Sequence, residues 1–319
     1  MKDAIHGREL FTLEVIDTRI QGTCHFPYGE ASGAHEKLHH PKGTGILILS
    51  GLLAHRTGNG DTSVYWADSF AKLGYTCIRV DLPGSCDSGG DAPAEFMRFI
   101  DAGSYEAVTA EIIKQVIVRY NLSSVIIMGH CTGSVTALFA ASACQDCRGL
   151  VLMEPYFHML PPVRSQTREA ISNWAASNRL GRILSSIFDR LKGLRLRLSL
   201  HKSELPGNAN LPLLKRWKSL ASAGLPILVL KAPDPKTADA KPRPGVFDYI
   251  EYVVRLGGSR SRVDVKVIEG AAHSFADRPG RLAVRLYTEA WLSEHFPQAS
   301  ADALLLQDQS LQVEESLSS

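Results

Sequence analysis

The chain of 319 residues is long enough for one large domain with an insertion or for two small domains. Its 45% hydrophobic and 21% charged residues are ordinary for a soluble globular protein, and no apolar run reaches the roughly 18–20 residues that cross a bilayer. Residues 1–9 lack the apolar segment of a secretory signal peptide. We therefore expect a cytoplasmic protein without a membrane span.

Short apolar runs alternate with segments of helical spacing along most of the chain. Strands are predicted at residues 10–15, 19–25, 45–49, 76–80, 124–128, 149–153, 226–230 and 263–268. Helices are predicted at residues 64–73, 103–120, 132–143, 247–255 and 281–296. Because strands that alternate with helices imply βαβ crossovers, the sequence predicts an α/β protein with a mostly parallel sheet of about eight strands.

The alternation stops at residues 157–223, which are amphipathic and contain no clear strand. We expect this segment to be a helical lid inserted into a core made of residues 1–156 and 224–296. Within it, residues 157–220 carry twelve Lys/Arg and three Asp/Glu, a net charge of +9. The polar, partly acidic tail at 297–319 is expected to be partly disordered.

The segment Gly129-His130-Cys131-Thr132-Gly133 follows one predicted strand and precedes a predicted helix. It has the G-x-S-x-G pattern of a nucleophile elbow, with cysteine in place of serine. Small flanking residues are needed there because larger side chains would collide with the neighbouring strand and helix. The helix N-terminus beneath Cys131 would favour the reactive thiolate. An ordinary buried cysteine in a glycine-rich turn is the alternative.

In a hydrolase triad of this kind, an acid and then a base follow the nucleophile along the chain. His273, in the loop after the last predicted strand, is the expected base. Asp234, after the strand at 226–230, is the preferred acid. Glu154, at the end of the strand at 149–153, is the rival, since a carboxylate there can also reach the histidine. Either acid could instead be a turn residue beside a proline.

The remaining site residues follow from their positions relative to the strands. The backbone amides of Leu52 and Thr132 are expected to form the oxyanion hole, because one follows the strand at 45–49 and the other follows the nucleophile. Leu53, His130 and Tyr156 are expected to line the pocket.

Two further motifs bear on metals and cofactors. Cys144 and Cys147 have CxxC spacing, but no second CxxC or histidine pair completes a zinc set, so two ordinary thiols are favoured over a redox pair. Residues 81–89 are glycine-rich but lack the lysine of a phosphate loop. The sequence therefore predicts neither a metal nor a cofactor.

Over about residues 10–296 the chain resembles the α/β-hydrolase superfamily, and within it the small hydrolases associated with bacterial exosortase and exopolysaccharide loci. The similar stretches are residues 50–58, 73–75, 78–89 and 149–156. Those relatives also tend to carry cysteine at the elbow, as do the more distant dienelactone hydrolases and polyhydroxyalkanoate synthases. The resemblance implies a Cys-His-Asp hydrolase in which residues 81–89 form a conformational loop beside the active site. The chain departs from these relatives after Gly51, where Leu-Leu replaces the frequent Pro-Gln.

A cysteine nucleophile favours thioesters and activated esters or lactones over peptides, because exchange between a thiolate and a thioester is close to thermoneutral. The basic segment could attract an acidic acyl carrier protein or the phosphates of coenzyme A, or it could serve solubility. No nucleic-acid recognition motif accompanies the charge. The main hypothesis is a cysteine-dependent hydrolase or thioesterase. The alternatives are an acyltransferase or lyase with the same pocket, and a non-catalytic binding protein on a hydrolase scaffold. The oligomeric state is left open.

Overall fold

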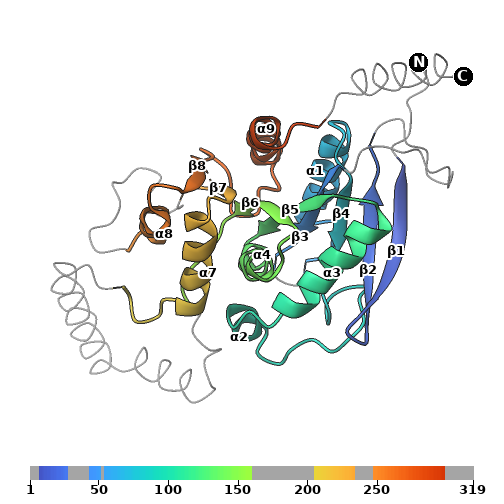
Figure 1. Ribbon diagram of the computed structural model, residues 1–319, viewed down its shortest axis with the longest axis horizontal. Helices are drawn as coiled ribbons and strands as arrows, with labels where there is room; N and C mark the ends of the chain where they lie inside the picture. Colours follow the sequence, from blue (N-terminus) through green and yellow to red (C-terminus); the bar gives the residue numbers. More distant parts are fainter. Residues whose placement is uncertain (1–6, 28–42, 52–53, 160–204, 234–246, 299–319) are drawn as a thin grey trace, which may run out of the picture.

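The computed structural model describes residues 7–27, 43–51, 54–159, 205–233 and 247–298. An eight-stranded sheet with the order β1-β2-β4-β3-β5-β6-β7-β8 runs through the centre of the molecule (Figure 1). Its antiparallel edge consists of β1 (Arg8–Val15) and β2 (Thr18–His25). The parallel strands are β3 (Thr44–Leu49), β4 (Cys77–Val80), β5 (Ser124–His130), β6 (Cys147–Met153), β7 (Pro226–Lys231) and β8 (Arg262–Val267). The predicted mostly parallel sheet is confirmed.

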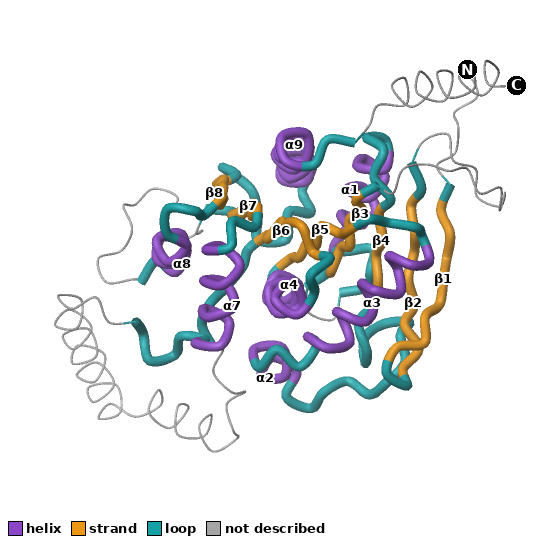
Figure 2. The backbone as a smooth tube through the Cα atoms, viewed as in Figure 1, coloured by secondary structure: helices purple, strands orange, loops and turns teal. Residues whose placement is uncertain are grey.

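Helices cover both faces of this sheet (Figures 1 and 2). On one face lie α1 (Thr62–Ala71), which follows the short 3-10 helix η1 (Asn59–Asp61), and α9 (Arg278–His295). On the other face lie α2 (Phe96–Asp101), α3 (Glu106–Arg119), α4 (Thr132–Ala143), α7 (Leu211–Ser222) and α8 (Tyr249–Gly257). Residues 132–141 of α4 are all buried, because this helix crosses the middle of the sheet beneath the other helices. None of the described helices combines the length and the apolar character that a membrane span requires.

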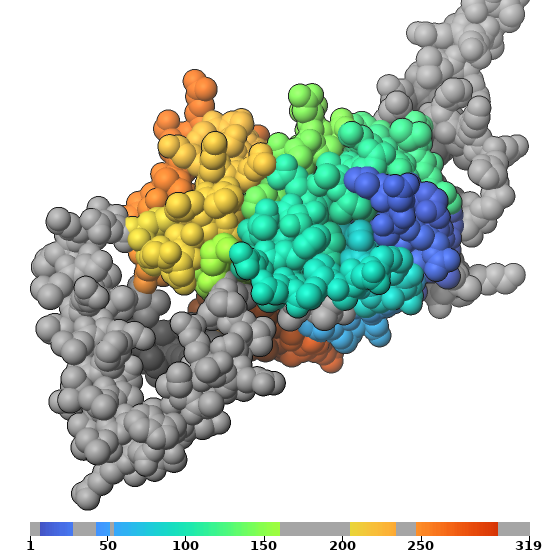
Figure 3. Space-filling view, turned by 90° about the horizontal axis from the view of Figure 1, so that it is seen from below, coloured from blue at the N-terminus to red at the C-terminus, as the bar shows by residue number. Residues whose placement is uncertain are grey.

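Two elements differ from the sequence expectations. The six-residue helix α2 was not predicted, and it packs against α4. The sequence places residues 205–223 in the lid, whereas α7 buries Leu213 and Trp217 against α4 and α8. In Figure 3 the yellow surface of this segment adjoins the green and teal surface of the preceding helices. The rest of the predicted lid, at 160–204, and the tail at 299–319 lie outside the described residues.

A buried polar network fixes the chain after β3. Arg79 on β4 is only 4% exposed, and its Nε donates to Nε2 of His25, whose Nδ1 donates to Asp68 at 2.7 Å. Nη1 of Arg79 also donates to the carbonyl of Arg56 at 2.8 Å. Burial lowers the pKa of Arg79 to about 10, so the side chain keeps its charge at neutral pH. The loop that leaves β3 is therefore attached to the interior of the sheet.

Candidate active site

Cys131 occupies the turn between β5 and α4. Its φ of 52° and ψ of −113° lie outside the regions that non-glycine residues usually adopt. The N–H of Cys131 donates to the carbonyl of Met153 at 2.8 Å, and its own carbonyl accepts from the N–H of Ser134 at 3.0 Å. The Ser134 hydroxyl is within 2.8 Å of the Gly129 carbonyl and 2.9 Å of the Met153 carbonyl. These bonds hold the thiol at the N-terminus of α4, where the sequence predicts a nucleophile elbow.

The glycines on either side of the elbow are required by close backbone contacts. A Cβ on Gly129 would lie 2.4 Å from the carbonyl oxygen of Gly133, and a Cβ on Gly133 would lie 2.4 Å from that of Leu49. In the loop that follows β3, a Cβ on Gly51 would lie 3.0 Å from the carbonyl oxygen of His130 and 3.4 Å from the Cβ of Cys131. The start of the expected oxyanion loop therefore lies directly beside the nucleophile position.

His273 lies in the loop between β8 and α9 and faces both Cys131 and a carboxylate. Its Nδ1 is 3.2 Å from Oε2 of Glu154. A side-chain hydrogen bond with Cys131, reinforced by one with Glu154, raises the pKa of His273 to about 10. The imidazole is 59% exposed, so solvent and small molecules can reach it. Thiol, imidazole and carboxylate thus form a connected row.

Glu154 is held firmly at the C-terminal end of β6. Its backbone has a φ of 50°, and its N–H donates to the Leu230 carbonyl of β7 at 2.9 Å. Its Oε1 accepts a hydrogen bond from the N–H of Ala232, while Oε2 faces His273. The preferred acid of the sequence analysis, Asp234, lies outside the described residues. Within the described part of the chain, the rival Glu154 is the carboxylate that lies against the histidine.

His130 supports the loop that carries His273. Burial lowers the pKa of His130, so its ring is neutral and its Nε2–H donates to the His273 carbonyl at 2.8 Å. The ring also lies against Phe275, with 6.1 Å between the ring centroids. His130 therefore positions the backbone of the histidine loop, in addition to any contact with substrate.

Tyr156 lies near Cys131 and binds a buried carboxylate. Its hydroxyl donates to Oδ1 of Asp101 at 3.1 Å, and Asp101 is 2% exposed. Burial, the charge of Asp101 and the proximity of Cys131 together raise the pKa of Tyr156, which keeps its hydroxyl protonated. Asn210 at the N-cap of α7 donates to the Asp101 carbonyl at 2.8 Å, so α2, α7 and the end of β6 are joined here.

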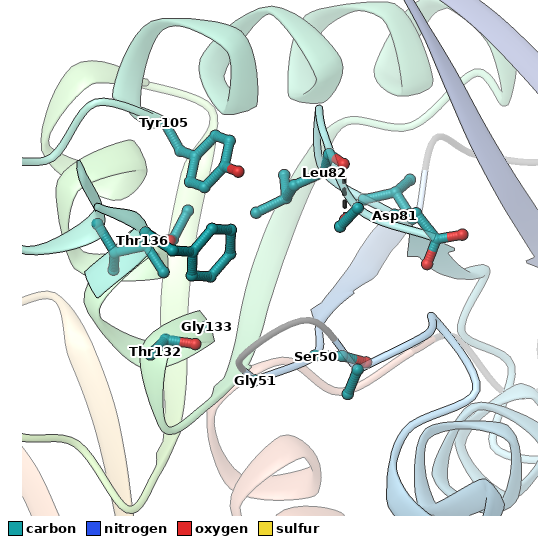
Figure 4. Close-up of a pocket in the computed structure, with 13 residues that line it drawn as sticks. Ser50, Gly51, Asp81, Leu82, Tyr105, Thr132, Gly133 and Thr136 are labelled. Carbon is teal, nitrogen blue, oxygen red and sulfur yellow. Dashed lines mark hydrogen bonds between the residues drawn. The ribbon is translucent and has the colours of Figure 1, made fainter. Parts of the chain in front are cut away.

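A cavity opens beside the N-terminus of α4 (Figure 4). The described residues that line it are Ser50, Gly51, Ala54, Val80, Asp81, Leu82, Ser85, Phe96, Ile100, Tyr105, Thr132, Gly133 and Thr136. Thr132, the expected oxyanion donor that follows Cys131, is among them, whereas His130 and Tyr156 are not. Leu52 and Leu53 lie outside the described residues. The cavity adjoins the place where the sequence puts the oxyanion hole.

The loop at 81–89 is held beside this cavity by charged groups. Nη1 of Arg56 donates to Oδ2 of Asp81 at 2.5 Å and to Oδ2 of Asp87 at 2.7 Å. His55 joins them, with Nε2 at 3.1 Å from Asp87. Although His55, Asp81 and Asp87 could together hold a metal ion, the Arg56 guanidinium already lies between the two carboxylates and balances their charge. This cluster, called the Arg56 clamp below, fixes the loop at 81–89 to the loop that follows β3.

Cys144 and Cys147 are both buried, at the end of α4 and the start of β6. Burial raises the pKa of both thiols, that of Cys147 to about 12. Protonated buried thiols are poor nucleophiles, which favours the interpretation of this CxxC pair as ordinary packing residues.

Comparison with known proteins agrees with this architecture. Residues 45–219 match the family profile described as alpha/beta hydrolase fold. This chain belongs to the α/β-hydrolase-fold family. No curated protein sequence matches it. As an α/β hydrolase, it has the mostly parallel sheet that the sequence analysis expects.

Solved structures resemble this α/β hydrolase across nearly its full length, at low identity. The Pyrococcus furiosus esterase Pf2001 is 12% identical with a TM-score of 0.58, covering 91% of this chain and 92% of that chain. TT1662 from Thermus thermophilus is 14% identical with a TM-score of 0.52, covering 90% and 98%. A dienelactone hydrolase from Anabaena variabilis is 14% identical with a TM-score of 0.50, covering 91% and 99%. These likenesses establish the fold alone.

Sequence reasoning missed two contributors to the site. Helix α2 supplies Phe96 and Ile100 to the cavity wall, yet it is too short for a periodicity signal. The Arg56 clamp joins residues that follow two different strands, β3 and β4. The alternation of Asp81 and Asp87 with glycines in the loop at 81–89 was the available signal for it.

Proposed function

We propose that the protein is a cysteine-dependent hydrolase that acts on thioesters or activated esters and lactones through an acyl-enzyme on Cys131. The observation that carries this proposal is the connected row of Cys131, His273 and Glu154 at the C-terminal edge of the parallel sheet. A thiol on a strained turn at a helix N-terminus, paired with an oriented imidazole, is the arrangement of an activated nucleophile.

In the acylation step, the thiol proton of Cys131 passes to His273, the sulfur attacks the carbonyl carbon, and the carbonyl π electrons move to oxygen. Since Nδ1 of His273 is engaged by Glu154, Nε2 is the nitrogen available to Cys131. The tetrahedral intermediate collapses and its bond to the leaving oxygen or sulfur breaks, and His273 supplies the proton that this atom takes. An ester or thioester then releases its alcohol or thiol, whereas an opened lactone keeps its hydroxyl on the acyl group. Glu154 orients the ring and stabilises the imidazolium throughout.

In the deacylation step, His273 removes a proton from water as its oxygen attacks the thioester carbon. The second tetrahedral intermediate collapses, the bond from carbon to Cys131 sulfur breaks, and the carboxylic acid leaves. The amides of Thr132 and Leu52 are proposed to stabilise both oxyanions, each contributing about 3 kcal/mol in related chemistry. The acid role passes to Asp234 if Glu154 proves dispensable.

The experiment offers the protein one acyl group as an aryl ester, a thioester and an amide, and offers a lactone as a separate substrate. We expect turnover of the ester, the thioester and the lactone but not of the amide, and mass spectrometry should detect an acyl adduct on Cys131. The Cys131→Ala variant should lose both, whereas the matched Cys86→Ala variant, which changes another accessible cysteine, should retain both. Turnover without Cys131 would exclude the covalent mechanism.

The same assay identifies the molecule that accepts the acyl group from Cys131. Release of the free acid supports hydrolysis, whereas transfer to an added thiol or alcohol supports the acyltransferase alternative. Ester and lactone carbonyls are the first to test, because structures on this fold carry the names esterase and dienelactone hydrolase. Elimination without an acyl adduct would support a lyase, and unproductive binding of every substrate a non-catalytic protein.

We also propose that an acyl carrier protein or coenzyme A presents the acyl group to the basic segment at 157–220. In its described part, Lys215 and Lys218 are exposed on α7, while Arg216 pairs with Glu106. The Lys215→Glu and Lys218→Glu substitutions should raise KM for carrier-bound thioesters and leave small thioesters unaffected. Lys114→Glu on α3, outside the segment, is the matched control. Equal effects on both substrate classes would contradict this proposal.

A further inference from the structure

Strand β8 forms one edge of the sheet, and within the described ranges its partner is β7 alone. Its six residues alternate between valine and charge, so Val263, Val265 and Val267 share one face of the strand. Val265 is 36% exposed and Val267 is 49% exposed. An edge strand that presents apolar side chains and unpaired backbone groups is a template for pairing with another chain.

The charged residues of β8 lie in a self-complementary order. In an antiparallel pair of two β8 strands centred on Val265, each Asp264 faces Lys266 of the second copy. The same register places Val263 opposite Val267, and Val265 opposite itself. Opposite charges and β-branched residues in directly facing positions both stabilise a strand pair.

Neighbouring registers are electrostatically unfavourable. A shift towards the start of the strand places Asp264 opposite Asp264, and Arg262 opposite Lys266. A shift the other way places Lys266 opposite Lys266. Since like charges in facing positions destabilise a strand pair, the sequence of β8 favours one register. Charged residues on an edge strand often prevent pairing with another chain. In the order found on β8, they instead favour antiparallel pairing in a single register.

The opposite edge of the sheet is different. Along β1, Gln115 of α3 donates to the backbone carbonyl of Glu14 at 3.0 Å, and Arg119 of α3 pairs with Glu9 at 2.6 Å. Side chains of α3 therefore reach the edge of β1. On β8, by contrast, His295 of α9 contacts Arg262 and Asp264 from one face of the sheet.

We propose that two copies of this chain associate by antiparallel pairing of their β8 strands, with Asp264 of each copy facing Lys266 of the other. The sheet then continues across both copies. This proposal is independent of the chemistry at Cys131, which lies on the more central strand–helix turn after β5.

Charge exchange tests the register. Sedimentation equilibrium of the full chain should find a dimer for the wild type. Asp264→Lys and Lys266→Asp should each raise the dimer dissociation constant by about tenfold or more, since each places like charges in two facing pairs. An equimolar mixture of these two variants should restore the dimer as a mixed species, because every facing pair is then opposite in charge. Leu10→Asp on β1, where Leu10 is 73% exposed, should leave the dimer unchanged.

Cross-linking tests the geometry by a separate measurement. In a Cys86→Ala background, Val265→Cys should form an intermolecular disulfide on mild oxidation, because facing Cβ atoms lie about 4.5–5.5 Å apart. Leu10→Cys is the control and should not cross-link. A wild type that stays monomeric at high concentration, or a dimer that neither charge variant weakens, would overturn the proposal.

Discussion

Oε2 of Glu154 lies 3.2 Å from Nδ1 of His273, while Oε1 of the same carboxylate accepts a hydrogen bond from the N–H of Ala232. One side chain thereby joins the end of β6, the start of the loop after β7 and the loop after β8. Because both carboxylate oxygens are engaged, the group has a fixed orientation, and the imidazole that it binds is aligned with Cys131.

This geometry predicts that Glu154, and not Asp234, orients the base. Glu154→Gln should lower kcat by about 10²–10⁴-fold, because the amide no longer stabilises the imidazolium and can impose the wrong tautomer. Asp234→Asn is the matched variant and should stay within a few-fold of the wild type. Steady-state kinetics on one activated ester suffices, and the reverse ranking of the two variants would reassign the acid.

The pKa of His273 should depend mainly on Cys131. A hydrogen bond with Cys131 is the largest cause of its rise from 6.5 to about 10, followed by the bond with Glu154. An NMR titration of the imidazole should therefore find a large fall in the pKa of His273 in Cys131→Ala and a smaller one in Glu154→Gln. A pKa near 6.5 in the wild type would contradict the contact.

The raised pKa of His273 also makes the stability of the folded protein depend on pH. Since the pKa of His273 is raised in the folded state, its contribution is complete below the unfolded value of 6.5 and is lost as pH rises towards about 10. Denaturation of the wild type and of Cys131→Ala should thus differ most at low pH within this window and converge at its upper end. Because the ring is largely exposed, the difference should be small.

The elbow glycines should be intolerant of even one methyl group. Gly129→Ala or Gly133→Ala brings a Cβ to 2.4 Å from a backbone oxygen, which cannot move without displacing β3 or α4. We expect a loss of about 1–3 kcal/mol in unfolding free energy together with loss of activity. Gly207→Ala is the control, since a Cβ there meets no atom within 4 Å. Thermal denaturation measures the stability of the variants, and turnover of an activated ester measures their activity.

The Arg56–Asp81 pair should matter far more than a surface pair. Asp81 is 2% exposed and binds both the backbone N–H and the guanidinium of Arg56. Arg56→Ala leaves this carboxylate buried without its main partner and should cost about 3–5 kcal/mol. Arg98→Ala breaks the exposed pair with Glu95 and should cost less than about 1 kcal/mol. Chemical denaturation of both variants checks the contrast, and equal costs would contradict it.

Much of the fold could be predicted because the signals are local. The buried strands are short apolar runs, and helices such as α7, α8 and α9 repeat their apolar residues with helical spacing. The elbow was also legible, since the strand, the glycines and the helix that create it are contiguous around Cys131. Helix α2, by contrast, has six residues and too few turns to produce a periodic pattern.

The role of α7 could not be read from the sequence for a different reason. The amphipathic pattern of Leu211–Ser222 indicates that one face of the helix is buried. It does not indicate which element that face packs against. The structure sets Trp217 against Phe157, with 5.3 Å between ring centroids, and α7 against α4 and α8. Its apolar face therefore covers the core.

The sequence by itself determined the strand–turn–helix motif that presents Cys131, the strand that precedes His273 and the mostly parallel sheet, because each depends on residues adjacent in the chain. Only the tertiary structure brings the Glu154 carboxylate to the histidine. Glu154 and Asp234 follow neighbouring parallel strands, β6 and β7, and both could approach the same loop. The N–H of Glu154 donates to the Leu230 carbonyl and its carboxylate accepts from the N–H of Ala232, and such contacts arise only when the strands pair.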